Sequence, residues 1–473
     1  MREVEIRPVP LDRLVELLTP ERADRLAWYA EWARALLNGR TVWNISSTSR
    51  GGGVAEMLQT LLAYGRGARV DTRWLVLDGD RDFFTLTKRL HNQLHGSPGD
   101  GGDLGAPESD HYTRVLAYNL PMAAQVIRPG DIVLLHDPQP AGLAAGLRDL
   151  GAHVVWRCHI GRDEPCALSD SAWEFLRPHI TAASGFIFSR REYVPPWLPQ
   201  EEVVVIPPSI DPFSTKNAAL TPAQTRAALG HAGLVSFGYD EADLGFNRRG
   251  GTRGKVRAHR GLVDGDGPIP AGARLVVQVS RWDALKDMSG VLAGFAEHLD
   301  DLPPDVHLAL VGPDTSGVDD DPEGAAVLAD CRARWSALDD AARRRTHLVS
   351  LPMRDVDENA HLVNALQQYA FTVVQKSLVE GFGLTVTEAM WKSKPVIASA
   401  VGGIQDQIED GVHGLLLADP TDLGAYAKAL SRVLTEQGLA ESLGEAARDR
   451  VQERFLGDRH LIQYVDLFEA LLQ

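Results

Sequence analysis

Two carboxylates, Glu380 and Glu388, stand on either side of a glycine-containing turn at residues 381–383. An apolar run at residues 371–374 precedes the turn and is typical of a buried strand, and a helical pattern begins at about Leu384. Ligands of open parallel sheets bind beside the carboxyl ends of the strands. Free N–H groups at a helix start favour an anion, and carboxylates accept hydrogen bonds from hydroxyl groups. This stretch therefore predicts a site for a phosphorylated sugar.

Glu388 has an alternative interpretation within the same stretch. Thr385 and Glu388 have the spacing of a capping box, in which the glutamate side chain accepts from a free N–H at the helix start and does nothing else. The stretch taken alone favours neither interpretation, so residues elsewhere in the chain must decide between them.

Two cations, Arg281 and Lys286, follow another strand-like run at residues 275–279. At adjacent strand ends they can face Glu380, and a pair of cations suits a diphosphate whose charge grows as a bond breaks. The alternative is that both are surface charges. The glycines at residues 51–53 also lie between a strand and a helix, where a backbone can approach a phosphate, although a plain flexible turn fits them equally well.

Two histidines end neighbouring strand-like runs in the first half of the chain. His136 opens His136-Asp-Pro-Gln-Pro140, and His159 ends Trp156-Arg-Cys-His159. A histidine at a strand end can donate a hydrogen bond to a sugar hydroxyl or move a proton. A single such histidine is more often structural, whereas two on neighbouring strands favour a site.

The totals limit the class of protein. A chain of 473 residues exceeds what one hydrophobic core usually serves, so two domains are expected. The net charge of −16 argues against a nucleic-acid partner. Three cysteines provide neither a disulfide framework nor a metal quartet. With no apolar run long enough to cross a bilayer, we expect a cytoplasmic protein with no membrane partner and no metal.

Strand-like runs alternate with helical patterns through most of the chain, which predicts an α/β fold with parallel sheets covered on both faces. The runs of the first half are 42–45, 74–77, 131–135, 153–158, 185–188 and 203–206, and those of the second are 275–279, 308–311, 348–351, 371–374, 396–399 and 414–417. A proline-rich break at residues 207–212 separates the halves, and a polar region with an Arg-rich excursion, residues 246–259, follows as an expected linker and mobile segment. The last helical pattern has an apolar stripe, Leu461, Ile462, Val465, Phe468 and Leu472, which predicts core packing.

With these residues in view, the chain resembles retaining glycosyltransferase family 4. Glu380 and Glu388 are similar to that family's E-x7-E pattern, and Arg281 with Lys286 to its diphosphate-binding pair. Further blocks look like the trehalose glycosyltransferring synthases, and the resemblance extends from about Val42 to Leu472. The blocks are 47–56, 136–140, 156–160, 188–196, 206–212 and 401–407. The chain departs from the synthases at Gly161, where they usually have an acidic residue.

The resemblance implies a fold and a set of roles. The fold is GT-B, with two Rossmann-like domains facing each other across a cleft: residues 1–212 with a returning helix at 458–473 for the acceptor, and residues 213–457 for the donor. The donor would contact Gly52, Gly53, Arg281, Lys286, Glu380, Gly381, Phe382, Gly383, Leu384 and Glu388. The acceptor pocket would contain His136, Asp137, Gln139 and Arg157. His159, Glu380, Arg281 and Lys286 would serve catalysis.

The activity implied is transfer of glucose from a nucleoside-diphosphate-glucose to a sugar, most simply glucose to form trehalose, with the sugar nucleotide as co-substrate and no cofactor. Alternatives with the same fold are a transferase for another acceptor, such as an aminocyclitol or natural-product sugar, and a trehalose phosphorylase. The alternative from a different class is a non-catalytic nucleotide-sugar-binding protein. A homodimer is one assembly that the sequence leaves open.

Overall fold

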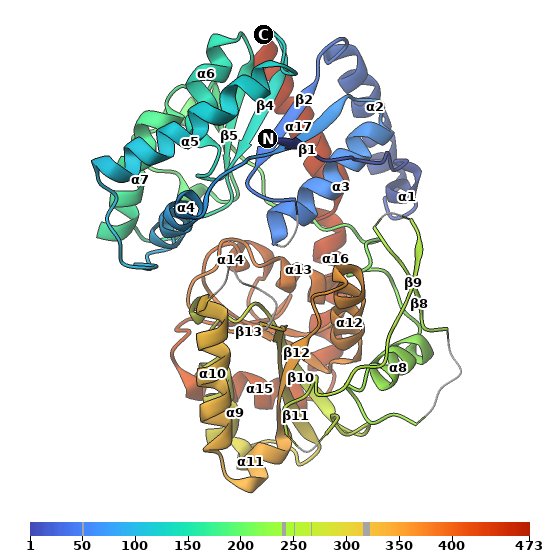
Figure 1. Cartoon of the computed structure of the whole chain (residues 1–473). Helices are drawn as coiled ribbons and strands as arrows, with labels where there is room; N and C mark the ends of the chain where they lie inside the picture. Colours follow the sequence, from blue (N-terminus) through green and yellow to red (C-terminus); the bar gives the residue numbers. More distant parts are fainter. Residues whose placement is uncertain (50–51, 239–242, 250, 266, 316–321) are drawn as a thin grey trace. The chain divides into compact units, whose positions relative to one another are not determined.

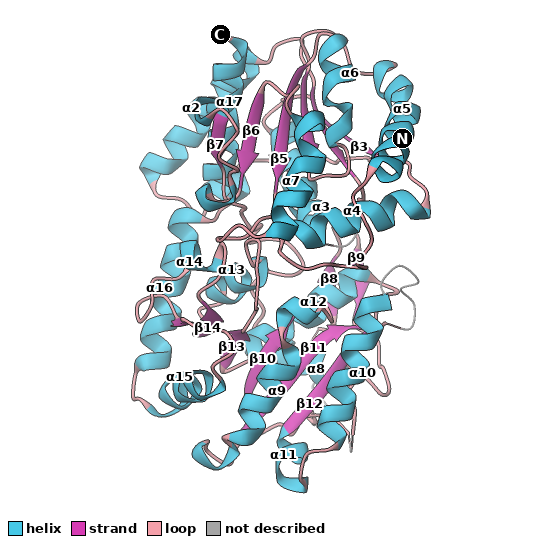
Figure 2. Ribbon diagram, turned by 90° about the vertical axis from the view of Figure 1, so that its left-hand side faces the viewer, coloured by secondary structure: helices cyan, strands magenta, loops and turns pink. Residues whose placement is uncertain are grey.

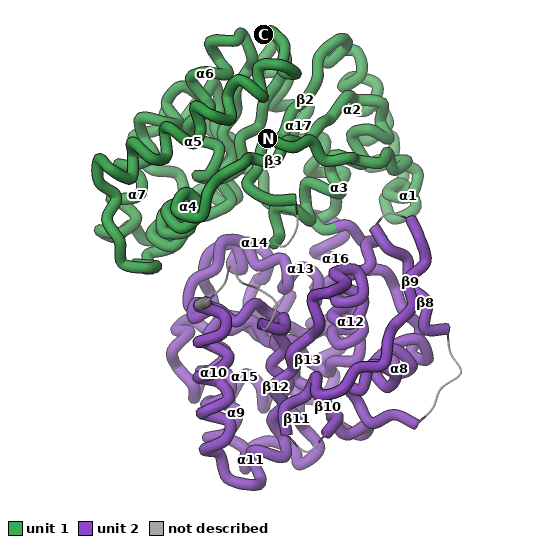
Figure 3. The backbone as a smooth tube through the Cα atoms, viewed as in Figure 1, with its two compact units in different colours: residues 1–210, 455–473 green, residues 211–454 purple. Residues whose placement is uncertain are grey.

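The computed structural model describes residues 1–49, 52–238, 243–249, 251–265, 267–315 and 322–473. The chain divides into two compact units, coloured separately in Figure 3. Unit 1 contains residues 1–210 and 455–473, and unit 2 contains residues 211–454. The last helix thus belongs to the unit that contains the amino terminus.

Unit 1 is built on a seven-stranded sheet with the order β1-β3-β2-β4-β5-β6-β7. Only β1, at one edge, pairs antiparallel to its neighbour in the described part of this sheet. The strands are β1 (Arg2–Glu3), β2 (Val42–Ser46), β3 (Thr72–Val76), β4 (Ile132–His136), β5 (His153–Cys158), β6 (Gly185–Phe188) and β7 (Val203–Val205). Their central members are nearly continuous apolar runs, as expected of strands that helices bury on both faces.

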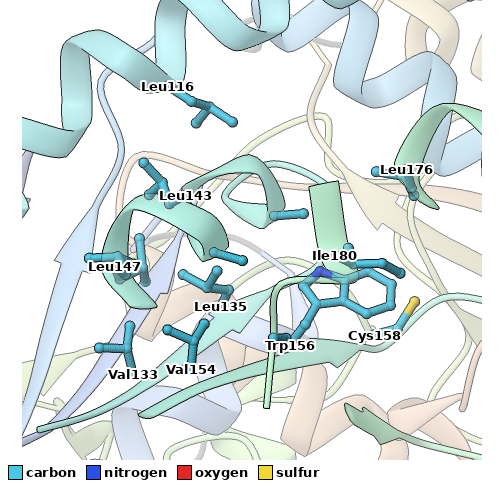
Figure 4. Packing of buried hydrophobic residues seen from close by; sticks show 14 of the residues in the cluster. Leu116, Val133, Leu135, Leu143, Leu147, Val154, Trp156, Cys158, Leu176 and Ile180 are labelled. Atoms are coloured by element: carbon cyan, nitrogen blue, oxygen red, sulfur yellow. The ribbon is translucent and has the colours of Figure 1, made fainter. Parts of the chain in front are cut away.

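Helices cover both faces of this sheet, as Figure 1 shows. One face packs on α3 (Gly53–Gly67) and α17 (Gly457–Leu472), with α2 (Pro20–Leu36) against α17 and α1 (Asp12–Val15) before it. The other packs on α4 (Arg81–Leu94), α5 (Ala106–Ala124), α6 (Ala144–Asp149) and α7 (Ala167–Ile180). Figure 4 shows this second core, which includes Leu135 and Trp156 of the sheet together with Leu143 and Leu147.

Unit 2 contains a six-stranded parallel sheet with the order β12-β11-β10-β13-β14-β15. The strands are β10 (Arg274–Val279), β11 (Val306–Pro313), β12 (Thr346–Leu351), β13 (Thr372–Gln375), β14 (Val396–Ser399) and β15 (Leu415–Leu417). On one face lie α9 (Met288–Glu297), α10 (Pro322–Ser336), α11 (Asp340–Arg345) and α15 (Leu423–Thr435). On the other lie α12 (Val356–Tyr369) and α13 (Leu384–Trp391), backed by α8 (Pro222–His231) and α16 (Leu439–Arg454), with the short α14 (Ile404–Gln407) beside α13 (Figure 2).

The order of strands reverses once in each sheet. In unit 2 the chain builds outward from β10 through β11 to β12 and then resumes on the other side of β10 with β13. In unit 1 it builds from β2 to β3 and resumes on the other side of β2 with β4. At such a switch the connecting loops diverge and leave a crevice at the carboxyl ends of the strands. The two expected binding regions are therefore the ends of β10 and β13, and the ends of β2 and β4.

All twelve predicted strands have a counterpart in the structure, so the prediction of alternating α/β halves is confirmed. The stripe on the last helix is also confirmed as core packing, because Ile462, Val465 and Phe468 are buried in unit 1. A short edge strand, β1, was not predicted, since two exposed residues carry no apolar pattern.

The mobility of the Arg-rich excursion stays a prediction, but its described residues contain regular structure that the sequence did not indicate. They form a hairpin, β8 (Gly245–Asn247) and β9 (Arg253–Lys255), that ion pairs fasten to the first turn of α12. Arg248 lies 2.6 Å from Asp355, and Arg257 binds the fully buried Glu358. Acidic residues are favoured at a helix amino terminus, and here they also provide the partners that order the excursion.

Candidate active site

An ion pair joins the two loops at the strand-order switch of unit 2. Lys286, in the short 3-10 helix that follows β10, lies with its Nζ 2.7 Å from Oε2 of Glu380, which follows β13. Ser377 Oγ donates to the same carboxylate oxygen at 3.1 Å. Glu380 is only 9% exposed, so the attraction between the two charges is weakly screened. The structure thus brings together two residues that the sequence placed at facing strand ends, although it did not predict their ion pair.

A second ion pair, between Lys376 and Asp287, lies on the same two loops. Lys376 is fully buried, and Asp287 occupies the left-handed region with φ 48° while its side chain accepts from Gly290 N–H at the start of α9. Sequence reasoning missed this pair. The available signal was a lysine directly after the last residue of β13, because a lysine there is rarely buried without a partner.

The glycine turn after Glu380 is supported from behind by α14. Gly383 has φ 84°, a conformation that favours glycine, and it is the residue immediately before α13. The Gln407 side chain donates to the carbonyl oxygens of Phe382 and Gly403, and it accepts from Thr387 Oγ1 at 2.6 Å. Gln407 therefore holds the shape of the turn and was also missed, because it acts from 24 residues away.

The capping-box interpretation of Glu388 is wrong. The helix begins one residue after Gly383, so Thr385 lies inside α13, and its hydroxyl donates to Gln375 Oε1 at 3.0 Å. Glu388 is 3% exposed, and Lys216 Nζ lies 3.5 Å from its Oε1. The other interpretation, in which Glu388 binds the ligand, stays a prediction.

Lys392, one turn after Glu388, is half-buried beside the same carboxylate. Its Nζ donates to the Glu388 backbone oxygen at 3.0 Å and to Asn217 Oδ1 at 3.1 Å. Burial lowers the pKa of Lys392 to about 7, and the neighbouring Glu388 carboxylate opposes this change. Two lysines, Lys216 and Lys392, therefore lie beside the Glu388 carboxylate, and a bound anion would change the pKa of each.

Arg281 follows β10 and pairs with Asp283. Its side chain is half exposed and lies 3.1 Å from Asp283, which also caps the 3-10 helix that contains Lys286. Its predicted role in binding a diphosphate stays a prediction.

In unit 1, His136 and His159 lie together at the strand-order switch. Nδ1 of His136 is 3.1 Å from Nε2 of His159, and their rings stack with centroids 5.4 Å apart. Asn44 of β2 contacts His136 Nε2 through its Oδ1 at 2.9 Å. Burial, reinforced by the charge of Arg157, lowers the pKa of both histidines well below the usual value, so both rings are neutral at physiological pH.

Asp137 follows His136 in a strained turn with φ 66°. Its carboxylate accepts from the His159 backbone N–H at 2.7 Å, and its carbonyl oxygen accepts from Trp156 Nε1 at 2.9 Å. Burial raises the pKa of Asp137 to about 7, against the effect of the His159 N–H. Gln139 lies half-buried two residues further along the same turn.

Arg157 is fully buried and directs its guanidinium at the last helix. It donates to His460 Nε2 at 3.0 Å, to the Tyr464 hydroxyl and to the Ile206 carbonyl oxygen at 3.1 Å. His460 Nδ1 in turn contacts Ser209 Oγ at 2.9 Å. His460 and Tyr464 were missed because they lie about 300 residues away in the sequence, and no local pattern marks them. Its predicted role in binding the acceptor is untested.

Two glycine positions complete the predicted set. Gly52 and Gly53 lie exposed at the start of α3, and Gly52 has φ 83° with open space around it, while Gly51 and Arg50 lie outside the described residues. At Gly161, a side chain would meet the ring of Tyr193 at 2.2 Å, which explains why no acidic residue stands there.

Among the described residues, no group of three or more His, Cys, Asp or Glu side chains could hold a metal ion. A search of the same residues finds no helix that is long and apolar enough to cross a membrane. The expectation of a metal-free enzyme stays a prediction.

Comparisons with known proteins follow the division into two units. Residues 44–195 match the family described as "Trehalose synthase, N-terminal domain", and residues 264–450 match "Glycosyl transferases group 1". The chain is 34% identical to a trehalose synthase of Thermococcus litoralis over 92% of this chain and 91% of that protein. It is 33% identical to a trehalose synthase of Rubrobacter xylanophilus over 92% of each chain.

A solved structure titled "Trehalose-6-phosphate synthase. OtsA" superposes with a TM-score of 0.66 at 14% identity, covering 91% of this chain and 99% of that one. This likeness shows the fold, which is GT-B. Together with the sequence identity, it establishes that the chain is a glycosyltransferase that belongs to the trehalose synthase family.

Proposed function

We propose that this enzyme transfers glucose, with retention of the α configuration, from a nucleoside-diphosphate-glucose to glucose and so forms trehalose. The observation that carries the proposal is the Lys286–Glu380 pair, held at 2.7 Å at the strand-order switch of unit 2, beside a glycine turn and the start of α13. The identity of 33–34% to proteins named trehalose synthases supports the choice of glucose as acceptor.

Unit 2 binds the donor in this proposal. Lys286 and Arg281 neutralise the diphosphate, with help from the N–H groups at the start of α13. Glu380 accepts hydrogen bonds from the donor hexose, and the backbone of Gly381, Phe382, Gly383 and Leu384 lies against it. Glu388 accepts from the ribose hydroxyls. Gly52 and Gly53 are further donor-binding residues in this proposal.

Unit 1 binds the acceptor. His136, Asp137 and Gln139 follow one another at the end of β4, and Arg157 at the end of β5 supports this region through its contacts with α17. Neutral imidazoles and a carboxyl whose pKa is about 7 can exchange hydrogen bonds with sugar hydroxyls without introducing a full buried charge. His159 lies beside the transferred glucose.

The chemical step is a front-face substitution. The bond between C1 of glucose and the phosphate oxygen breaks, and the acceptor hydroxyl oxygen forms a new bond to C1 on the same face. The acceptor proton passes to the departing phosphate oxygen. The products are trehalose and a nucleoside diphosphate, and the charge that develops on the phosphate is met by Lys286 and Arg281.

Incubation of the purified protein with UDP-, ADP-, GDP- and TDP-glucose, each with glucose, tests the proposal. We expect release of a nucleoside diphosphate and of an equal amount of a non-reducing disaccharide with at least one donor. Absence of disaccharide with every donor would overturn it. Glycosylation of an aminocyclitol instead of glucose would indicate another acceptor, and phosphate-dependent cleavage of trehalose without nucleotide would indicate a phosphorylase.

The Glu380→Ala variant distinguishes an enzyme from a non-catalytic sensor. Glu436→Gln serves as the surface control. Glu436 pairs with Arg432 on the exposed face of α15 and lies outside the proposed site. An enzyme loses turnover by orders of magnitude in the first variant and keeps it in the second. A protein that binds the sugar nucleotide but shows no turnover in the wild type would be a sensor.

A further inference from the structure

Three side chains form a continuous hydrogen-bonded chain at the strand-order switch of unit 1. Asn44 Oδ1 lies 2.9 Å from His136 Nε2, and His136 Nδ1 lies 3.1 Å from His159 Nε2. Asn44 and His136 are 3% and 1% exposed, so water does not compete for these contacts. Their backbones are fixed by neighbouring positions in the sheet, because β2 pairs in parallel with β4.

The position of the hydrogen on each histidine ring follows from Asn44, the first of these three side chains. An amide oxygen can only accept, so His136 Nε2 must carry a hydrogen. A neutral imidazole has one N–H, which leaves His136 Nδ1 as an acceptor and requires His159 Nε2 to donate to it. The remaining nitrogen of His159, Nδ1, then has no hydrogen and can only accept. Among the described residues, none is hydrogen-bonded to that nitrogen.

The charged neighbours of the two rings do not compete with Asn44. Asp137 accepts from the backbone N–H of His159 and not from its ring. Arg157 gives its donors to His460, Tyr464 and Ile206, and it disfavours a protonated ring at either histidine. The neutral state, in which the tautomer matters, is therefore the relevant one.

Among the described residues, Asn44 is the side chain that accepts from His136 Nε2, and its other side is apolar. There Asn44 lines an apolar cavity between β2, α2, α3 and α17, with Leu58, Leu62 and Leu134 in its walls. If residue 44 were apolar, a hydrogen on His136 Nε2 would face hydrocarbon, at a cost of about 1–3 kcal/mol. The ring would then move its hydrogen to Nδ1 and donate to His159 Nε2, and His159 would carry its own hydrogen on Nδ1.

We propose that Asn44 is a positioning residue that sets the tautomer of His159 through His136. It leaves His159 Nδ1 as a hydrogen-bond acceptor for a hydroxyl of the sugar that is transferred. The tautomer concerns the free protein, whereas the contact with sugar rests on the proposed function. Asn44 touches no substrate, and its effect reaches the reaction only through the two rings.

The tautomer is measured on the free protein by long-range ¹H–¹⁵N correlation with ¹⁵N-histidine labelling, and His136→Gln and His159→Gln assign the signals. We expect both rings of the wild type to carry hydrogen on Nε2. Asn44→Leu, which is close to isosteric, should move the hydrogen of both rings to Nδ1, and Asn44→Asp, which keeps an acceptor, should not. A wild-type His159 with hydrogen on Nδ1, or unchanged signals in Asn44→Leu, would overturn the proposal.

Kinetics of the same variants separate a positioning role from a structural one. We expect kcat to fall about 10- to 100-fold in Asn44→Leu with little change in the donor KM, and Asn44→Asp to restore most of it. Should Asn44→Leu fail to fold, the wild-type tautomer and the Asn44→Asp variant still decide the point. If the tautomers agree but no glycosyl transfer occurs in the wild type, the proposed function fails and the tautomer assignment stands. If transfer occurs and Asn44→Leu keeps full kcat, the positioning role fails.

Discussion

The two strand-order switches of this enzyme carry side chains of opposite character. At the switch of unit 2, two lysines face two carboxylates, in the pairs Lys286–Glu380 and Lys376–Asp287. At the switch of unit 1, the corresponding side chains are two neutral histidines and an amide. One fold therefore provides an ionic region in one unit and an uncharged hydrogen-bonding region in the other.

The difference matches the two kinds of ligand in the proposed reaction. A diphosphate carries charge into the protein, and buried lysines that already have partners can exchange part of that contact for phosphate oxygens. A glucose acceptor carries only hydroxyl groups, which lose little in contact with neutral donors and acceptors. The single fixed charge near the histidines, Arg157, is buried and engaged by α17.

Lys286→Met removes one of the two lysines at the switch of unit 2. We expect kcat/KM to fall by about 10²–10³-fold, because a cation that stabilises charge developing on the leaving group is lost. Steady-state assays of nucleoside diphosphate release measure the change. Arg432→Met, which breaks an exposed pair on α15, serves as the control and should retain activity. Activity of Lys286→Met within about threefold of wild type would remove Lys286 from the site.

The neutral switch of unit 1 depends on Arg157, whose contacts stabilise the fold. Arg157→Met leaves the Ile206 carbonyl, the Tyr464 hydroxyl and His460 without their donor, so we expect unit 1 to lose about 3 kcal/mol of stability. Denaturant unfolding followed by tryptophan fluorescence measures the change, because seven of the ten tryptophans lie in unit 1 and three lie in unit 2. A variant of unchanged stability that fails to bind the acceptor would instead place Arg157 in the acceptor pocket.

A smaller effect on kinetics tests whether Glu388 binds the donor ribose. If its carboxylate binds the donor ribose equally in the ground state and the transition state, Glu388→Gln should raise the donor KM about tenfold and leave kcat nearly unchanged. Glu436→Gln is the matched control on the surface. A loss of kcat without a change in KM would show that Glu388 acts in the chemical step.

The contrast between the units also explains which features the sequence predicted. Apolar runs located twelve of the thirteen strands of the two sheets, and the position of Lys286 and Glu380 after such runs indicated that they could face each other. Strand order was not predictable, because pairing β10 with both β11 and β13 depends on packing over about 100 residues. The partners of Arg157 and the support from Gln407 come from distant segments whose residue types have no periodic pattern. The Arg-rich hairpin was not predicted because its ion-pair partners, Asp355 and Glu358, lie at the start of another element, α12.

The smallest effect concerns the one carboxyl at the neutral switch. Burial raises the pKa of Asp137 to about 7, so the folded protein keeps a proton that the unfolded chain has released between about pH 4 and pH 7. The stability that Asp137 contributes is therefore complete at low pH and decreases as the pH rises through this window. Asp137→Asn cannot ionise, and asparagine tolerates the positive φ of this position.

Because Asp137 is partly exposed, solvent screens most of this effect. We expect the melting temperature of Asp137→Asn to exceed that of the wild type by about 2–4 °C at about pH 8 and to match it at about pH 4. Differential scanning calorimetry of both proteins at the two pH values measures this difference. Glu436→Gln, on the surface of unit 2, should show no such divergence as the pH rises. A constant difference between Asp137→Asn and wild type at both pH values would mean that Asp137 ionises normally, and the switch of unit 1 would then carry a charge like that of unit 2.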